Sequence, residues 1–207
     1  MLRKKRIHPR TTNSGHQFRI YPDLVNTSPR FIPRKSGELV VGDITYIYTR
    51  DGFAYLSLLT DAYSRYIVGH CLYPTLAAEG CVKALKMALT TYRQAGIAPS
   101  GLVHHSDRGI QYASREYTEV LKSENISISM TQTGDPLHNA LAERMNNTLK
   151  NGWLFNNGEL SLSQAVVAVD KAIHMYNEAR PHNALDMRTP RQLFKGDDSN
   201  PLLNWKV

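Results

Sequence analysis

Cysteine is scarce in this chain of 207 residues, which contains only Cys71 and Cys81. Two cysteines cannot build a disulfide framework or a cysteine-rich zinc module. Long apolar runs are also missing, since no stretch approaches the roughly 20 residues that a bilayer-spanning helix needs. The basic start of the chain is not followed by an apolar stretch, so we expect no secretory signal. These absences favour a protein of a reducing compartment that has no membrane partner.

Apolar residues nonetheless make up 42% of the chain, which is enough for a sizeable core and excludes general disorder. Runs of β-branched and aromatic residues predict three antiparallel strands joined by tight turns, followed by two shorter strands. Apolar residues at helical spacing predict helices before, between and after the shorter strands. The strands are expected at 38–48, 53–61, 65–73, 101–107 and 126–130, and the helices at 79–93, 114–122, 137–150 and 161–178. This order predicts an α/β fold with one mixed five-stranded sheet and helices on both faces.

Positive charge is concentrated at the start of the chain. Residues 1–36 hold nine Lys and Arg against a single acid, Asp23, whereas the whole chain carries a net charge of only +7. The same segment contains four prolines and shows no sustained apolar period. We therefore expect a basic extended arm at 1–36, a folded core at 37–196 and a C-terminal tail at 197–207.

Three roles fit the basic arm. Basic tails commonly bind nucleic acid, because Lys and Arg displace counterions from the phosphates. The densest basic cluster consists of Arg3, Lys4, Lys5 and Arg6. The arm is alternatively a solubilising linker. It also fits a strap that lies across the core or another subunit and uses its large apolar side chains as anchors, namely Phe18, Ile20, Tyr21 and Phe31.

Three acidic residues occupy positions that indicate a metal site. Asp43 lies in the middle of the first strand, where a charge is costly without a partner, and Asp107 directly follows the fourth strand. Glu143 lies on the polar side of the helix at 137–150, away from its apolar stripe. If the first and fourth strands are neighbours, Asp43 and Asp107 lie side by side and Glu143 closes over them. Taken singly, each acid also has a structural explanation, as a hydrogen-bonded core acid, a turn residue and a solvated helix residue.

The kind of ligand decides which metal such a site would bind. Three carboxylates without cysteine or a clear histidine pair favour Mg²⁺ or Mn²⁺ over zinc. Sites of this kind commonly hold two ions, about 3.5–4 Å apart, which activate a water or hydroxyl and stabilise the leaving oxygen of a phosphodiester. The pattern therefore favours metal-dependent chemistry on phosphodiesters.

The spacing of the three acids and the sequences around them resemble one known family. There are 63 residues between Asp43 and Asp107, and 35 between Asp107 and Glu143. The flanking sequences are GDITYI, HSDRGIQY and NALAER, and two further segments match in order, SISMTQTGDP and YNEARPHNALDMRTPRQLF. Over residues 36–196 the chain thus resembles the Asp-Asp-35-Glu catalytic cores of retroviral integrases and insertion-sequence transposases.

The resemblance implies a ribonuclease-H-like fold and a DNA strand-transfer enzyme, with Asp43, Asp107 and Glu143 as catalytic residues and ligands of Mg²⁺ or Mn²⁺. It also implies that Asn139 and Lys150 approach the DNA end. The implied partners are transposon ends and target DNA, further copies of the chain, and a helix-turn-helix DNA-binding protein from an upstream reading frame. The implied location is the bacterial cytoplasm. Two alternatives are a metal-dependent nuclease of the same fold and a non-catalytic DNA-binding remnant.

Three other polar residues are candidate DNA contacts. Asn147 lies on the same polar stripe as the third acid. Arg180 and His182 follow the last predicted helix. They either touch phosphate or belong to a C-terminal cap that Tyr176 and Leu185 pack against the core, and the sequence leaves both interpretations open.

Overall fold

The computed structural model describes residues 15–132, 145–148 and 159–196 of the chain. Its strands are β1 (Leu39–Thr49), β2 (Gly52–Asp61), β3 (Ile67–Tyr73), β4 (Val103–Ser106) and β5 (Ser127–Met130). Its helices are α1 (Ala78–Gln94), α2 (Ile110–Ala113), α3 (Arg115–Ser123), α5 (Leu162–Ala179) and α6 (Pro190–Lys195), with a 3₁₀ turn at Asn183–Leu185. Residues 145–148 are helical as well.

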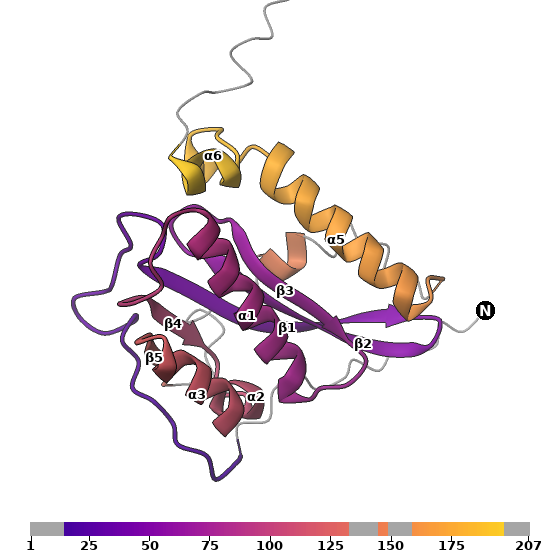
Figure 1. Ribbon diagram of the computed structural model, residues 1–207, viewed down its shortest axis with the longest axis horizontal. Helices are drawn as coiled ribbons and strands as arrows, with labels where there is room; N and C mark the ends of the chain where they lie inside the picture. Colours follow the sequence, from indigo (N-terminus) through magenta and orange to yellow (C-terminus); the bar gives the residue numbers. More distant parts are fainter. Residues whose placement is uncertain (1–14, 133–144, 149–158, 197–207) are drawn as a thin grey trace, which may run out of the picture.

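The five strands form one mixed sheet in the order β3-β2-β1-β4-β5 (Figure 1). The first three strands pair antiparallel, while β4 runs parallel to both β1 and β5. Gly52, at φ +112°, allows the tight turn between β1 and β2. The predicted α/β fold with a mixed five-stranded sheet is confirmed, and the first and fourth strands are neighbours, as the metal-site hypothesis requires.

Helices cover both faces of the sheet (Figure 1). On one face, α1, α2 and α3 enclose an apolar core that includes Val40, Leu59 and Val68 of the sheet. On the other face, α5 packs over Leu56 and Leu58. The two faces are apolar at alternate strand positions, because successive side chains of a strand point to opposite sides. This arrangement confirms the predicted helices on both faces.

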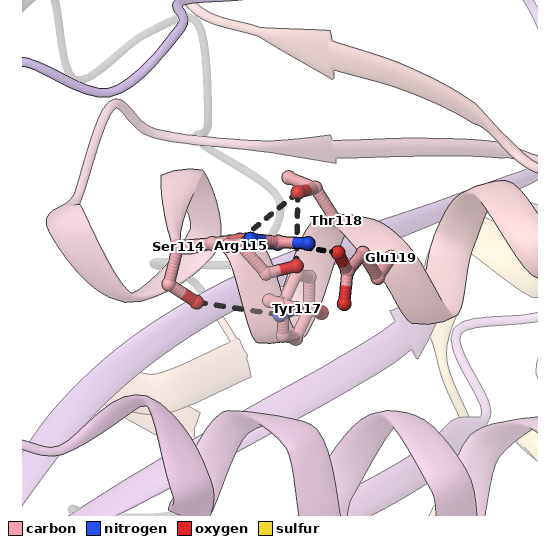
Figure 2. Close-up of polar contacts among 5 residues, drawn as sticks. All are labelled: Ser114, Arg115, Tyr117, Thr118 and Glu119. Carbon is pink, nitrogen blue, oxygen red and sulfur yellow. Dashed lines mark hydrogen bonds and ion pairs between the residues drawn. The ribbon is translucent and has the colours of Figure 1, made fainter.

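The start of α3 is fixed by local hydrogen bonds (Figure 2). Ser114 is the N-cap of α3, and its Oγ accepts a hydrogen bond from Tyr117 N at 3.3 Å. Arg115 Nε and Glu119 Oε1 form an exposed ion pair at 2.6 Å on the outer side of the same turn. Tyr117 itself is fully buried, and its hydroxyl lies 2.8 Å from His104 Nε2 on β4. The cap therefore helps to fix a tyrosine that contacts β4.

The described half of the arm, residues 15–36, packs against the sheet. Met130 N donates a hydrogen bond to Pro22 O at 3.3 Å, and Leu24 N donates one to Ser129 Oγ at 2.8 Å. The arm therefore runs along the outer edge of β5, where Figure 1 shows it as the indigo trace. Its contacts are those of a strap, the third role that the sequence allowed.

The apolar anchors of this strap differ from the predicted ones. Val25 is buried against β1, and Tyr21 and Phe31 are half-buried against the core, whereas Phe18 and Ile20 are 43% and 42% exposed. The prediction of Phe18 and Ile20 as anchors is wrong. Side-chain size alone could not identify the anchors, because the arm docks in this region largely through its backbone and polar groups.

The opposite edge of the sheet is also occupied. Asn177 on α5 donates from Nδ2 to Ile67 O at 3.0 Å and accepts at Oδ1 from Ile67 N at 2.9 Å. The backbone N–H of His70 points to Met87 Sδ at 3.4 Å. Side chains of α5 and α1 thus satisfy backbone groups along the outer side of β3.

Two short helices, α2 and α6, were not predicted. Segments of four and six residues contain too few turns to show an apolar period. The helix α6 nevertheless begins with a capping box of Thr189 and Gln192 and with Pro190 at its first turn, which are local signals present in the sequence. The predicted helix at 137–150 lies outside the described residues except for 145–148. Within the described ranges, no helix combines the length and the apolar character needed to cross a bilayer.

His104 makes the stability of the fold depend on pH. Burial, and to a lesser degree the charge of His105, lowers the pKa of His104 from 6.5 to about 3. Below pH 6.5 the unfolded chain therefore binds a proton at this position that the folded chain does not bind, so stability falls as the pH falls. We expect a loss of about 2 kcal/mol from this group between pH 7 and pH 5.

Denaturant unfolding of the wild-type protein and of His104→Phe, at pH 7.5 and at pH 5, tests this expectation. The variant should be less stable at pH 7.5, because Tyr117 loses its partner, but its stability should depend less on pH. Equal pH dependence of the two proteins would contradict the assignment to His104.

Candidate active site

Asp43 lies in the middle of β1, at the level where β4 ends. Its side chain is half-buried, and its Oδ1 accepts a hydrogen bond from Ile44 N at 2.9 Å. Its Oδ2 accepts a hydrogen bond from Asn146 Nδ2 at 2.6 Å, a short, charge-assisted contact. The carboxylate is thus held by its own strand and by a segment 103 residues further along the chain.

The register of β1 and β4 places Asp107 beside Asp43. Val40 pairs with His104 and Val41 with His105 in parallel, so two further steps along both strands lead to Asp43 and Asp107. Asp107 directly follows β4, and its Oδ1 accepts a hydrogen bond from Gly109 N at 2.9 Å. The register therefore brings the two predicted carboxylates, which have 63 residues between them in the sequence, to one level of neighbouring strands.

A buried tyrosine lies near both carboxylates. Burial raises the pKa of the Tyr112 phenol well above its usual range, and the charges of Asp43 and Asp107 contribute to the rise. The Tyr112 hydroxyl is enclosed, and no hydrogen-bond partner for it is found among the described residues. A second enclosed polar atom, Gln111 Oε1, is equally without a partner in that part of the chain, while Gln111 Nε2 donates to Leu76 O at 2.9 Å.

Gly109 leaves the space that the Asp107 carboxylate occupies. A Cβ at this position would lie 2.9 Å from Asp107 Oδ1 and 3.2 Å from Gln111 Oε1. Its backbone, with φ −61° and ψ 139°, is one that any residue adopts. A side chain at this position would therefore displace the Asp107 carboxylate, although the backbone conformation would accept it.

Asn146 is a site residue that sequence reasoning missed. Its side chain is 5% exposed, its Nδ2 contacts Asp43, and its Oδ1 is enclosed without a partner among the described residues. The neighbouring Met145 packs with α5, and the Tyr176 hydroxyl points to its sulfur at 3.3 Å. Asn147, which the polar stripe had favoured, is exposed. Asn146 could have been found from its helical spacing to Asn139, because residues seven apart share a face.

Several predicted site residues lie outside the described part of the chain. These are Glu143, Asn139, Lys150, Arg3, Lys4, Lys5 and Arg6. Their predicted roles rest on the sequence.

Arg180 and His182 lie at the C-terminal end of α5. Burial, and then the charges of Arg180 and Arg65, lowers the pKa of His182 to about 4, so that the imidazole is neutral at pH 7. The ring packs edge-on against Tyr176 at 5.0 Å, and both Tyr176 and Leu185 are buried. The structure thus shows the C-terminal cap, and phosphate contact by Arg180 and His182 stays a prediction.

The described residues contain two of the three predicted metal ligands. Accordingly, no group of three His, Cys, Asp or Glu that could hold a metal ion is found within the described ranges. The ligands present fit Mg²⁺ or Mn²⁺: two half-buried carboxylates come from β1 and from the residue that follows the neighbouring β4, and one enclosed amide oxygen, Asn146 Oδ1, has no partner in the described part of the chain. Adjacent carboxylates repel each other unless a cation or a proton neutralises them.

The crowding at Gly109 gives a test of this site. In Gly109→Ala, the added methyl group should displace the Asp107 carboxylate and weaken Mn²⁺ binding by about 10- to 100-fold, as changes next to metal ligands commonly do. The melting temperature should change by only a few degrees, because the backbone is unstrained and the displaced group is a side-chain end.

Titration with Mn²⁺, followed by the electron paramagnetic resonance of the free ion, measures the binding. Ile110→Ala is the matched control, because it changes the next residue, the first of α2, and adds no atom beside Asp107. Unchanged Mn²⁺ affinity in Gly109→Ala would contradict the placement of the ion at Asp107.

Two family models match the chain. A model described as the integrase core domain matches residues 33–136, and a second integrase core domain model matches residues 124–190. Together they cover the five strands, α1, both carboxylates and the whole of α5.

Bacterial insertion-sequence proteins are similar along most of the chain. The chain is 34% identical to the uncharacterized 31 kDa protein of insertion element IS600 from Shigella sonnei, over 91% of this chain and 67% of that protein. It is 32% identical to the transposase for insertion sequence element IS629 from Shigella sonnei, over 84% of this chain and 56% of that protein. It is 39% identical to a putative transposase for IS986/IS6110 from Mycobacterium tuberculosis, over 62% of this chain and 46% of that protein. The chain thus spans about half to two thirds of the length of these relatives.

Solved structures show the same fold. The HTLV-2 integrase catalytic core domain in complex with magnesium superposes with a TM-score of 0.60 at 20% identity, covering 79% of this chain and 99% of that one. A chain of the simian T-cell lymphotropic virus intasome, in complex with PP2A regulatory subunit B56 gamma, gives a TM-score of 0.66 at 20% identity over 93% of this chain and 63% of that one. The predicted ribonuclease-H-like fold is confirmed.

Proposed function

Because the chain belongs to the integrase core family, together with the insertion-sequence transposases that it matches, we propose that it catalyses metal-dependent DNA strand cleavage and strand transfer in transposition. The observation that supports this proposal most directly is the placement of Asp43 beside Asp107 by the parallel pairing of β1 with β4. The chain has the family's fold, and the two carboxylates occur within the matched region.

We propose Glu143 as the third carboxylate. Asn146 contacts Asp43 from a helical segment, and residues three or four apart on a helix lie on one face. Glu143 precedes Asn146 by three residues, so a helix continued toward the N-terminus would present Glu143 to the same pair of acids. Asn139 precedes Asn146 by seven residues and Lys150 follows it by four, and residues at these spacings lie on the same side of a helix. This spacing supports their proposed contact with the DNA end.

Asp43, Asp107 and Glu143 would together hold Mg²⁺ or Mn²⁺, with two ions expected. When bound, such ions lower the pKa of an attacking water or 3′ hydroxyl and stabilise the leaving oxygen. The protein's own contribution is to hold the carboxylates in place. Ile44 N and Asn146 fix both oxygens of Asp43, and Gly109 N fixes one oxygen of Asp107. Held in this way, the side chains would need little rearrangement to bind metal and DNA.

The proposed partners are DNA of the transposon ends and of the target, further copies of the chain, and a helix-turn-helix protein from an upstream reading frame. The proposed location is the bacterial cytoplasm. Asn147 is exposed beside the site and suits a contact with DNA. Arg180 is proposed as a phosphate contact, whereas His182, neutral and packed on Tyr176, fits the structural cap better.

A strand-transfer assay tests the function. A labelled duplex with a candidate terminal repeat is incubated with target DNA and Mg²⁺ or Mn²⁺, and both cut and joined products are measured. Asp43→Asn, Asp107→Asn and Glu143→Gln should each reduce both products by at least about 1000-fold, because the ions lose a charged ligand. Glu119→Gln, an exposed acid on α3, is the control and should retain activity.

The products separate the proposal from its two alternatives. Joined product supports the transposase. Metal-dependent cutting without joining on any terminal repeat would indicate a nuclease of the same fold, and neither product would indicate a non-catalytic remnant.

The basic end of the arm is proposed to bind DNA. Each phosphate that Lys or Arg neutralises on duplex DNA contributes about −0.9 to the slope of log K against log salt. Replacing Arg3, Lys4, Lys5 and Arg6 by Ala should therefore flatten that slope by up to about 3.6. The strap at 15–36 stays intact in this variant.

The matched control removes four exposed lysines from other elements, Lys83, Lys86, Lys171 and Lys195. Fluorescence anisotropy of labelled duplex at several salt concentrations measures the slope. If the control flattens the slope as much as the arm variant, the arm has no special role in DNA binding.

A further inference from the structure

The arm contacts the chain on both sides of Asp107, at the end of β4 and in the turn that follows it. On one side, His16 Nε2 donates a hydrogen bond to Arg108 O at 2.9 Å. On the other side, the arm contacts His105, a residue of β4 that precedes Asp107 by two positions. Two separate points of the arm thus bracket a proposed catalytic residue.

The contact at His105 belongs to a connected set of four side chains. Asn26 Nδ2 donates to Asp23 Oδ2 at 2.9 Å and lies 3.5 Å from His105 Nε2. His105 Nδ1 lies 2.8 Å from Ser129 Oγ on β5. We call these residues, Asp23, Asn26, His105 and Ser129, the arm network.

The donors and acceptors of the arm network are mutually consistent. The Asn26 amide can only donate at Nδ2, so His105 Nε2 is the acceptor and His105 Nδ1 carries the proton. Ser129 Oγ then accepts from His105 Nδ1 and from Leu24 N, the latter at 2.8 Å. A single imidazole tautomer satisfies every contact, and the arm supplies groups at both ends of the network.

The arm end of the network is a charged group in a buried turn. Asp23 is 5% exposed, and its Oδ1 accepts from Val25 N at 2.9 Å and Asn26 N at 2.8 Å. Burial alone would raise the pKa of Asp23, but the hydrogen bonds from Asn26 and Val25 outweigh burial and lower it. The ionised carboxylate holds the Asn26 amide in the orientation that meets His105.

Asp107 depends on such support because the sheet ends at this point. The described ladder between β1 and β4 ends at Val41 and His105, and the ladder between β4 and β5 ends at Ser106 and Met130. The position of Asp107 is therefore set by how the last residues of β4 are held and by the turn that follows.

We propose that Asn26, oriented by Asp23, is a positioning residue that acts through His105 to place the Asp107 carboxylate. The strap at 15–36 is then a working part of the catalytic centre and not only a connection to the basic end of the arm. This inference rests on the proposed function of Asp107 and is tested separately from it.

The test compares full-length wild-type protein with Asn26→Ala and with Asn26→Asp, which keeps the shape of the side chain but presents an acceptor to His105. Thr27→Ala is the matched control, an exposed neighbour on the same turn. Four quantities are measured: Mn²⁺ affinity without DNA, kcat and KM of strand transfer, melting temperature, and hydrogen exchange at the amides of Arg108 and Gly109 in metal-free protein.

Both Asn26 variants should weaken Mn²⁺ binding and lower kcat by about tenfold or more, the size of effect seen when a residue that orients a metal ligand is lost. KM for DNA should stay unchanged, the melting temperature should stay within a few degrees of wild type, and exchange at the two amides should become faster. Ser129→Ala should lower kcat too, and combining it with Asn26→Ala should add little, because both act through His105.

Two results would overturn the inference. One is Mn²⁺ affinity and kcat in the Asn26 variants equal to those of Thr27→Ala. The other is a loss that follows the melting temperature or affects KM alone, which would assign Asn26 to folding or to DNA binding. The proposed function is judged by Asp107→Asn in the same assays: if that variant keeps Mn²⁺ binding and strand transfer, the function of the site is wrong, whatever the Asn26 variants do.

Discussion

The parallel pairing of β1 with β4 is the constraint on which the site depends. It brings Asp43 and Asp107, which have 63 residues between them in sequence, to one level of the sheet. One step of register would send one of the two side chains to the opposite face. The surrounding elements hold this register. The antiparallel meander fixes β1 from one side, and β5 fixes β4 from the other. On the two faces, apolar clusters under α1 and under α5 determine which residues of β1 point inward.

Like charges placed side by side require compensation, and part of it comes from neutral donors. Asn146 and two backbone N–H groups contact the two carboxylates. Three enclosed polar atoms nearby, Gln111 Oε1, Tyr112 Oη and Asn146 Oδ1, find no partner among the described residues. An unsatisfied buried polar group costs about 1–3 kcal/mol, so such groups are rare where a fold is only structural. Of these three, Asn146 Oδ1 belongs to a side chain that contacts Asp43, so a ligand bound at the carboxylate could supply its missing partner.

Elements long enough to show a period of apolar residues were predicted from the sequence, and shorter or aperiodic elements were not. The five strands and the helices α1, α3 and α5 were predicted to within about two residues, because each contains enough residues to show its period. The helix α2 has only four residues. Asp43 and Asp107 were predicted because a charge at a strand centre or strand end is conspicuous. Asn146 was missed because its neighbour Asn147 fitted the polar stripe equally well, and only the contact with Asp43 distinguishes the two. The docking of Val25 and Asn26 could not be predicted, because it depends on a turn within a segment that lacks any period.

Backbone groups of both outer strands of the sheet are paired at positions that the structure describes. Pro22 O accepts from Met130 N along β5, and the Asn177 amide occupies both backbone groups of Ile67 on β3. Exposed strand edges otherwise act as templates for edge-to-edge aggregation. A sheet blunted at these positions disfavours self-association by strand addition. A second chain would have to displace these partners at Ile67 and Met130 before it could extend the sheet there.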